Sequence, residues 1–252
     1  MFVLFILTAV FAIMFLLPTV LTITNSFMAE SEINANYGMI FSSSAGSYVS
    51  DKVNLKFIPD KVTLSQYITG LVKSPDYLYK FWNSVLYTVP IMIFQLVIAL
   101  LASYGFMRLK GRLKEILFFV YIIICLMPYQ VTLVPNFLVS KWIGILDTRW
   151  AIWLPGMFSP FAVYLLTKYM RRIPKSIIEA AKVDGAGEWK IFMKICLPLC
   201  KGAIYSVAIL IFIDYWNMVE QPLILLADEY LHPLSIFLSK INVGEIGLTT
   251  EK

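Results

Sequence analysis

Residues 173–198 read IPKSIIEAAKVDGAGEWKIFMKICLP, and this pattern predicts a helix, a tight turn and a second helix. Pro174 stands where a first-turn proline, with its fixed φ, favours helix formation. Gly185 supplies the left-handed residue that ends the first helix. Asp184, directly before it, is expected to accept hydrogen bonds from backbone N–H groups of the turn.

Both predicted helices have one apolar face, because apolar residues recur at helical spacing: Ile177, Ile178 and Ala181 in the first, and Trp189, Phe192 and Ile195 in the second. A helix pair of this size cannot bury these faces by itself. It must press against the membrane surface, its own bundle or a partner. The small pair Ala180 and Ala181 would let a partner approach closely, with Glu179 offering a charge. The pattern alone favours an amphipathic helix on the membrane surface.

Composition indicates a membrane protein. Hydrophobic residues make up 59% of the chain and charged residues 15%, against roughly half and a quarter in soluble domains. There are 21 basic and 16 acidic residues, but the charges lie in short loops between apolar runs. A contiguous basic face is what nucleic acid requires, so no nucleic-acid partner is expected.

Five apolar runs approach the roughly 20 residues needed to cross a bilayer, and they cover residues 1–23, 84–107, 116–134, 150–167 and 197–213. Basic residues concentrate in the loop after the second run and in the loop between the fourth and fifth, which predicts that both loops and the N-terminus are cytoplasmic. Residues 24–83 and 220–252 are then extracytoplasmic, and residues 84–219 form the core transmembrane domain. Within 24–83, Ser and Gly at 42–46 suggest a flexible part, and 59–72 could form a short surface helix.

Neither a metal site nor a nucleotide-binding loop is expected in this chain. Cys125, Cys196 and Cys200 are interpreted as small buried hydrophobes, and the single His232 has no partner at ligand spacing. The sequence contains no GxxxxGK[ST] motif, so any energy from ATP must come from another subunit.

The motif in residues 171–198 resembles a known family. Its matching residues keep every spacing of the EAA-x3-G-x9-I-x-LP signature of binding-protein-dependent ABC importer permeases: Glu179, Ala180, Ala181, Gly185, Ile195, Leu197 and Pro198. The resemblance extends over most of the chain and is closest to carbohydrate permeases related to the smaller membrane subunit of the maltose transporter. It is seen in segments 57–87 with Asn83 and Ser84, 108–112, 127–135, 144–155 and 216–223.

This resemblance implies an all-α, polytopic transmembrane helix bundle of the type I ABC importer permease kind, in a bacterial plasma (inner) membrane. It implies three partners besides the lipid bilayer: an ABC ATPase dimer holding ATP and Mg, a second homologous permease subunit and an extracellular solute-binding protein. Residues 171–198 would couple the spans to the ATPase, and the solute would be a sugar or oligosaccharide. Relatives usually have a basic N-terminal tail and a sixth span. This sequence has neither, which indicates a truncated chain or the loss of that span.

Polar residues within or beside the spans are candidates for the translocation path, because such groups are expensive in hydrocarbon; they are Tyr129, Gln130, Asp214, Trp216, Asn217 and Glu220. Helix–helix hydrogen bonding explains Gln130 equally well, and interfacial anchoring explains Trp216. Three other functions stay open: a permease for a polyamine, phosphate or amino acid, an ion-driven transporter using Asp214 or Glu220, and a non-transporting scaffold.

Overall fold

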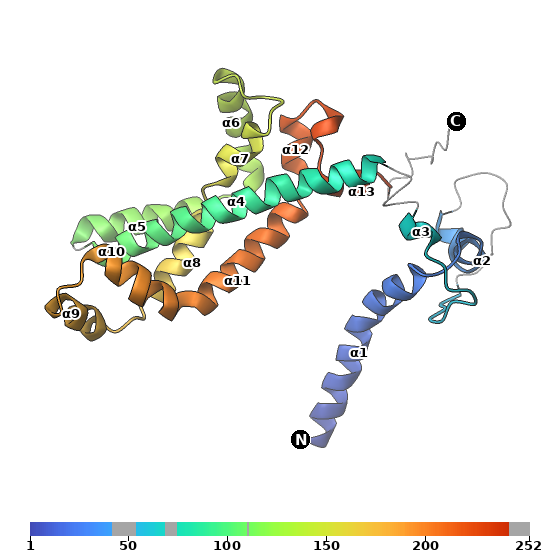
Figure 1. The fold of residues 1–252 in the computed structure, drawn as a ribbon, viewed down its shortest axis with the longest axis horizontal. Coiled ribbons are helices and arrows are strands. Elements are labelled where there is room, and N and C mark those ends of the chain that lie inside the picture. Colours follow the sequence, from blue (N-terminus) through green and yellow to red (C-terminus); the bar gives the residue numbers. More distant parts are fainter. Residues whose placement is uncertain (42–53, 69–74, 110, 242–252) are drawn as a thin grey trace. The chain divides into compact units, whose positions relative to one another are not determined.

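The computed structural model describes residues 1–41, 54–68, 75–109 and 111–241, and within these ranges the chain is helical with no strand. It divides into two compact units, Met1–Tyr79 with Lys240–Lys252 and Lys80–Ser239. Figure 1 labels the helices, which are α1 (Phe2–Asn25), α2 (Glu30–Phe41), α3 (Ser65–Ile68), α4 (Pro75–Arg108), α5 (Arg112–Cys125), α6 (Tyr129–Trp142), α7 (Trp150–Gly156), α8 (Pro160–Met170), α9 (Lys175–Val183), α10 (Glu188–Ile191), α11 (Leu197–Trp216), α12 (Glu220–Leu225) and α13 (Leu234–Ile241). A π-helical turn, Phe192–Cys196, joins α10 to α11, and a 3₁₀ turn, Glu229–Leu231, precedes α13.

Four helical stretches of the described chain are long and apolar enough to cross a membrane: Leu4–Asn25, Pro75–Arg108, Trp150–Met170 and Glu188–Trp216. The third predicted span, 116–134, falls on a broken helix. It is a pair, Lys114–Cys125 and Gln130–Trp142, bent by 98°. Pro128 precedes α6 with φ −59° and ψ 141°. Proline has no N–H to continue the helix and disfavours the α conformation at the residue before it, so the apolar run breaks there.

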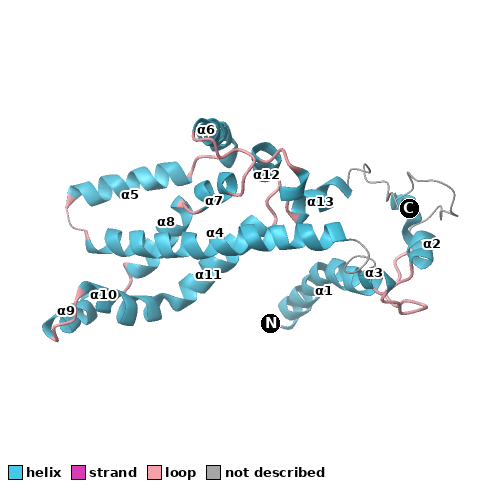
Figure 2. Cartoon of the chain, turned by 45° about the horizontal axis from the view of Figure 1, so that its top comes forward, coloured by secondary structure: helices cyan, strands magenta, loops and turns pink. Residues whose placement is uncertain are grey.

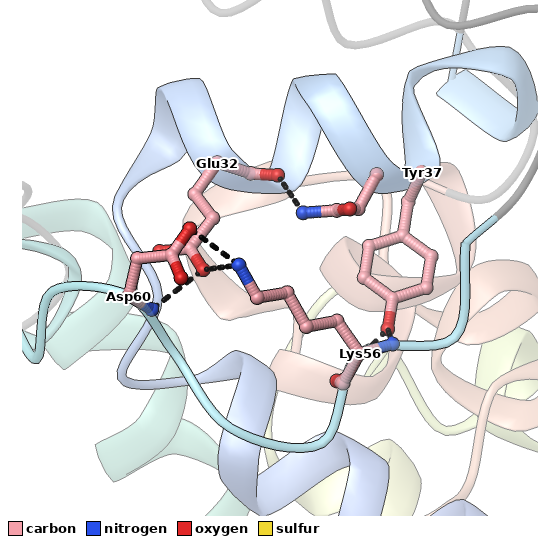
Figure 3. A network of polar contacts seen from close by, with 5 residues as sticks. Glu32, Tyr37, Lys56 and Asp60 are labelled. Atoms are coloured by element: carbon pink, nitrogen blue, oxygen red, sulfur yellow. Dashed lines mark hydrogen bonds and ion pairs between the residues drawn. The ribbon is translucent and has the colours of Figure 1, made fainter.

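The first unit holds a polar cluster between α2 and residues 54–68 (Figure 3). Glu32 Oε1 accepts from the Asp60 backbone N–H at 2.8 Å and lies 2.9 Å from Lys56 Nζ, which also pairs with the Asp60 carboxylate. Hydrogen bonding from the Asp60 N–H and then from Lys56 lowers the pKa of Glu32. Tyr37 Oη accepts from the Lys56 backbone N–H at 3.1 Å. We call these four residues the Glu32 cluster.

The surface helix expected at 59–72 appears only as α3, Ser65–Ile68. Residues 69–72 lie outside the described ranges, as does the stretch 42–46 that the sequence suggests is flexible.

In the second unit α4 runs between α5 on one side and α11 on the other (Figure 2). The core of this bundle contains Ala99, Ala162 and Ala203, whose small side chains let helices approach closely. Ser103 Oγ donates to Val163 O at 3.0 Å, so α4 and α8 are also joined by a buried hydrogen bond. Helices α9 and α10 lie at one end of the bundle, and α6, α7 and α12 lie toward the other.

Buried polar residues on α4 hold the chain that follows α12. Asn83 Nδ2 donates to Tyr230 O at 2.6 Å and to His232 O at 3.2 Å, while Arg149 Nη2 donates to Asn83 Oδ1 at 3.1 Å. Ser84 Oγ accepts from the Leu234 N–H at 2.9 Å. The Asn83 and Ser84 pair that resembles the family is thus an anchor for residues 230–234, and we call it the Asn83 anchor.

Candidate functional site

The turn between α9 and α10 is closed by the backbone in a Schellman arrangement. Gly185 has φ +76°, and its N–H donates to Lys182 O at 3.0 Å, while the Ala186 N–H reaches back to Ala181 O at 2.9 Å. These two bonds satisfy carbonyls that the end of a helix would leave free. The predicted helix, left-handed glycine and second helix are therefore confirmed.

Apolar contacts fix this helix pair to the end of the bundle. Ile178 is 5% exposed and belongs to a cluster with Met170, Ile191 and Phe192. Ala181 and Ala186, which the 2.9 Å hydrogen bond of the turn joins, both pack against that cluster. A hydrophobic contact between these positions commonly accompanies a Schellman motif, so the second alanine of the EAA pattern has a structural role.

The remaining predicted coupling residues divide between the surface and the junction with α11. Glu179, Ala180 and Asp184 are exposed. The Asp184 N–H donates to Ala180 O at 3.0 Å, but the described part of the chain shows no hydrogen bond to the Asp184 carboxylate. Pro174 is the residue before α9 rather than in its first turn. Glu179 and Ala180 are thus exposed and accessible to a partner.

The last three motif residues lie at a change of helix type. Ile195 is in the π-helical turn, and Leu197 and Pro198 begin α11. Pro198 has no N–H for a regular bond to Lys194 O, and its ring would clash there in an α-helix. Widening the preceding turn avoids this conflict, because π-helical turns are inserted as single turns within α-helices. The helix therefore continues through the proline without an intervening loop.

Glu188 is a functional candidate that the sequence did not reveal. Its Oε1 lies 2.7 Å from both Arg108 Nη2 and Lys182 Nζ, and its Oε2 accepts from Tyr104 Oη. The carboxylate thus joins the end of α4, the end of α9 and the start of α10 at one point. The available signal was charge complementarity between two loops, and it does not select Glu188 from the other acidic residues. We call these four residues the Glu188 junction.

A cavity of about 570 Å³ lies where α11 ends and α12 begins, and its lining includes Asp214, Asn217 and Glu220. Gln130 Nε2 lies 3.5 Å from Glu220 Oε2, which places α6 near the same carboxylate. Interrupted helices in transport proteins often surround solute sites, because the break frees backbone groups. The structure therefore brings three of the predicted polar residues together and Gln130 close to them.

Two other predicted path residues are placed differently. Trp216 stacks on Phe212 at 5.3 Å between ring centroids and meets Phe81 edge to face at 5.6 Å, so it packs in an aromatic cluster. The structure does not describe the side chain of Tyr129.

Cys196 and Cys200 are buried as expected, whereas Cys125 is half-buried. Among the residues described, no three His, Cys, Asp or Glu side chains gather as metal ligands would.

Comparison with known proteins identifies the family. Residues 64–236 match the binding-protein-dependent transport system inner membrane component family. The chain belongs to this family. Its all-α fold with several membrane-spanning helices and the predicted resemblance are confirmed, and the protein is a multi-pass permease component of an ABC importer.

Individual relatives agree with this assignment. A polygalacturonan/rhamnogalacturonan transport system permease protein of Bacillus subtilis is 31% identical over 203 residues, which are 79% of this chain and 70% of the relative. An arabinooligosaccharides transport system permease protein of Halalkalibacterium halodurans is 27% identical over 228 residues, covering 90% and 82%. A solved bacterial ABC transporter involved in alginate import shares the fold at 23% identity, with TM-score 0.75 over 95% of this chain and 78% of that one.

Proposed function

We propose that this chain moves a sugar or oligosaccharide through the membrane and is coupled to a separate cytoplasmic ATPase through residues 171–198. The observation that carries the coupling is the rigid helix pair at one end of the bundle. Its turn is closed by Gly185 and its inner face is packed, while Glu179 and Ala180 remain exposed. A helix fixed to the spans and open to a partner can transmit movement to them.

Two observations support a carbohydrate as the solute. The relatives above are named as permease proteins of transport systems for polygalacturonan and rhamnogalacturonan and for arabinooligosaccharides. The cavity after α11 presents carboxylate and amide groups from Asp214, Asn217, Glu220 and Gln221, and such groups can hydrogen-bond sugar hydroxyls. A polyamine, phosphate or amino acid remains the alternative solute class for a permease of this family.

The proposed partners follow from the family and from the sequence. This sequence has no phosphate-binding loop of the GxxxxGK[ST] kind, so we assign ATP hydrolysis to a partner and not to this chain. The partner is an ATPase dimer, which holds ATP and Mg. A second, homologous permease subunit completes the pathway, and an extracellular binding protein delivers the solute. Closure of the ATPase would have to favour the outward-facing state by about 5.5 kcal/mol to move the balance from 1:99 to 99:1.

The proposed orientation places the N-terminus and residues 171–198 in the cytoplasm, with residues 24–83 and 220–252 outside. A cysteine at Glu179, in a Cys125→Ser background, is expected to react with an impermeant maleimide only in inside-out vesicles. Cys196 and Cys200 are buried and should stay unlabelled. Labelling of position 179 in right-side-out vesicles would overturn the coupling proposal, because no cytoplasmic ATPase could reach it.

Function is tested by mild detergent extraction of the tagged chain followed by reconstitution of whatever remains bound. We expect an ABC ATPase to co-purify and to support ATP-dependent uptake of an oligosaccharide from a panel that includes a polyamine, phosphate and amino acids. Uptake driven by a proton or sodium gradient without the ATPase would contradict the proposal. ATP-dependent uptake of another solute on the panel would leave the coupling in place and remove the carbohydrate assignment.

A further inference from the structure

A second cavity, of about 600 Å³, opens at the same end of the bundle as α9. Its lining comes from four places: the end of α4, the first turn of α5, the residues after α8, and one side of α9. Five of its side chains are basic and two, Glu115 and Glu179, are acidic. We call this cavity the basic groove.

The positive charge of the basic groove is only partly neutralised by the protein. Arg108 and Lys182 share Glu188, as described above. The other three basic groups are Lys114 on α5, Arg171 after α8 and Lys175 on α9. Within the described ranges, none of these three has a carboxylate at ion-pair distance. These three cations, from three separate elements, line one space together with Glu115 and Glu179, and the remaining net positive charge would be offset by a bound anion.

The basic groove is also partly apolar, which favours an anion that carries an apolar part. Leu109, 50% exposed, lines it together with Ile173 and Ile178. The Arg171 guanidinium lies over the Phe118 ring at 4.4 Å, and Lys168 Nζ lies over Tyr164 at 5.6 Å. Basic groups beside aromatic rings at the ends of spans are typical of the membrane–water interface. A ligand with an anionic head and an apolar body fits this surface better than a small inorganic anion.

We propose that the basic groove binds the phosphodiester headgroup of an anionic membrane phospholipid. Lys114, Arg171 and Lys175 donate to the phosphate oxygens, while Leu109 and its apolar neighbours contact the glycerol and the first methylenes. A zwitterionic lipid is disfavoured because its own cation would face the same three basic groups. Because Lys114 is on α5, Arg171 directly follows α8 and Lys175 is on α9, a bound headgroup would connect these three elements at the membrane surface. This site does not depend on the nature of the transported solute.

The test uses the full chain in detergent, titrated with short-chain phosphatidylglycerol or phosphatidylcholine, with bound lipids counted by native mass spectrometry. The groove variant carries Lys114→Gln, Arg171→Gln and Lys175→Gln. Its matched control carries Arg172→Gln, Lys194→Gln and Lys201→Gln, which remove the same charges from residues that do not line the groove. Each basic group near a membrane surface changes anionic-lipid affinity by about fivefold. We expect the groove variant to bind phosphatidylglycerol on the order of 100-fold more weakly, and the control to change much less.

Several results would overturn the proposal. Equal binding of phosphatidylcholine and phosphatidylglycerol, or equal losses in the two variants, would remove the site. Inorganic phosphate that displaces phosphatidylglycerol at equal concentration would show an anion site with no lipid character. A groove variant that keeps phosphatidylglycerol but no longer retains the ATPase after extraction would identify the groove as a protein-docking surface. Size-exclusion profiles of both variants establish that each chain is folded before the titration.

Discussion

The two ends of the second unit are held by opposite means. At the α9 end, the Glu188 junction joins charged groups whose side chains remain between 31% and 52% exposed. At the other end, the Asn83 anchor is built on the neutral residues Asn83 and Ser84, each 1% exposed, and Arg149 is the one charged group that hydrogen-bonds to it. Exposed ion pairs contribute little and rearrange readily, whereas buried hydrogen bonds are costly to break. The apolar cluster at Ile178 keeps α9 packed on the bundle, and only the charged contacts beside it are of the exposed kind. We call the α9 end, for these charged contacts, the movable end, and the Asn83 end the fixed end.

The largest effect is expected at the fixed end. Asn83→Ala removes the donor to Tyr230 O and His232 O and the acceptor for Arg149, and buried polar groups that lose a partner cost about 1–3 kcal/mol each. We expect a loss of about 3 kcal/mol in the free energy of unfolding, measured by denaturant titration in detergent micelles. Asn217→Ala, which removes one exposed hydrogen bond to Ile213 O within its own helix, should cost less than about 1 kcal/mol. Similar losses in the two variants would contradict the distinction between the ends.

The turn of the movable end is the next most sensitive position. Gly185→Asp places a side chain at φ +76°, which costs roughly 1–2 kcal/mol in the left-handed region. A Cβ at Gly185 would meet no atom within 4 Å, so the strain lies in the backbone alone. We expect membrane insertion to persist while solute-stimulated ATP hydrolysis in vesicles is lost.

The control for this turn is Gly187→Asp. Gly187 has φ −68° and also has open space around a Cβ, so it tolerates a side chain without strain. Solute-stimulated hydrolysis should therefore be retained. If Gly185→Asp also retained normal stimulation, the rigid-helix account of coupling would have to be abandoned.

A smaller effect is expected from Glu188→Gln, which keeps the size of the side chain and removes its charge. Arg108 and Lys182 lose their shared partner, and exposed pairs of this kind are worth about 0.2–1 kcal/mol each. Amide hydrogen exchange in residues 184–188 should accelerate at low salt and match the unaltered chain at high salt, because salt screens such pairs. Glu179→Gln, an exposed carboxylate with no ion pair in the described ranges, serves as the control and should show no change. If the exchange rate in Glu188→Gln rose equally at low and high salt, the effect would come from altered packing and not from the lost charge.

The smallest effect concerns the Glu32 cluster of the first unit. The pKa of Glu32 is lowered from 4.5 by hydrogen bonds in the folded chain, so its stabilising contribution is present above pH 4.5 and is lost as the pH falls through the lowered value. The pKa of Lys56 is raised from 10.5 by Asp60 and Glu32, so its contribution is complete below pH 10.5 and is lost at higher pH. Exchange of the Asp60 amide, corrected for its intrinsic pH dependence, should accelerate a few-fold below pH 4.5. Glu32→Gln should remove this acid-dependent step, and its persistence would assign the step to another group.

The structure of the α9–α10 turn could be predicted from the sequence, because it depends on local sequence patterns. The α9–α10 turn depends on residues within one short stretch, and Gly185 is required there by a single backbone angle. Hydropathy identified the spans because crossing a bilayer demands a continuous apolar run. The broken third span shows the limit of that signal: residues 116–134 stay apolar through Pro128, although the backbone cannot continue straight.

Hydrogen bonds and ion pairs between residues far apart in the sequence could not be predicted in the same way. Asn83 and Tyr230 are separated by 147 positions, and Glu188 lies 80 positions from Arg108. Neither pairing produces a periodic pattern, and a buried asparagine resembles an exposed one in a single sequence. The fold class and the coupling motif were therefore predictable, while the groups that fix the two ends of the bundle required three-dimensional coordinates.

The π-helical turn before Pro198 has a mechanical consequence. Glu188 and Trp216 belong to one helical stretch of 29 residues. The Glu188 junction and the cavity at Asp214 therefore lie at opposite ends of the same helical stretch. The 20 residues of α11 extend roughly 30 Å, and a tilt of about 5° at the π turn would displace the far end by about 2.6 Å, by simple geometry on that length. A displacement of this size is comparable to one hydrogen-bond length. If α9 is coupled to the ATPase as proposed, a small rotation at that end would suffice to make or break contacts in the cavity at Asp214.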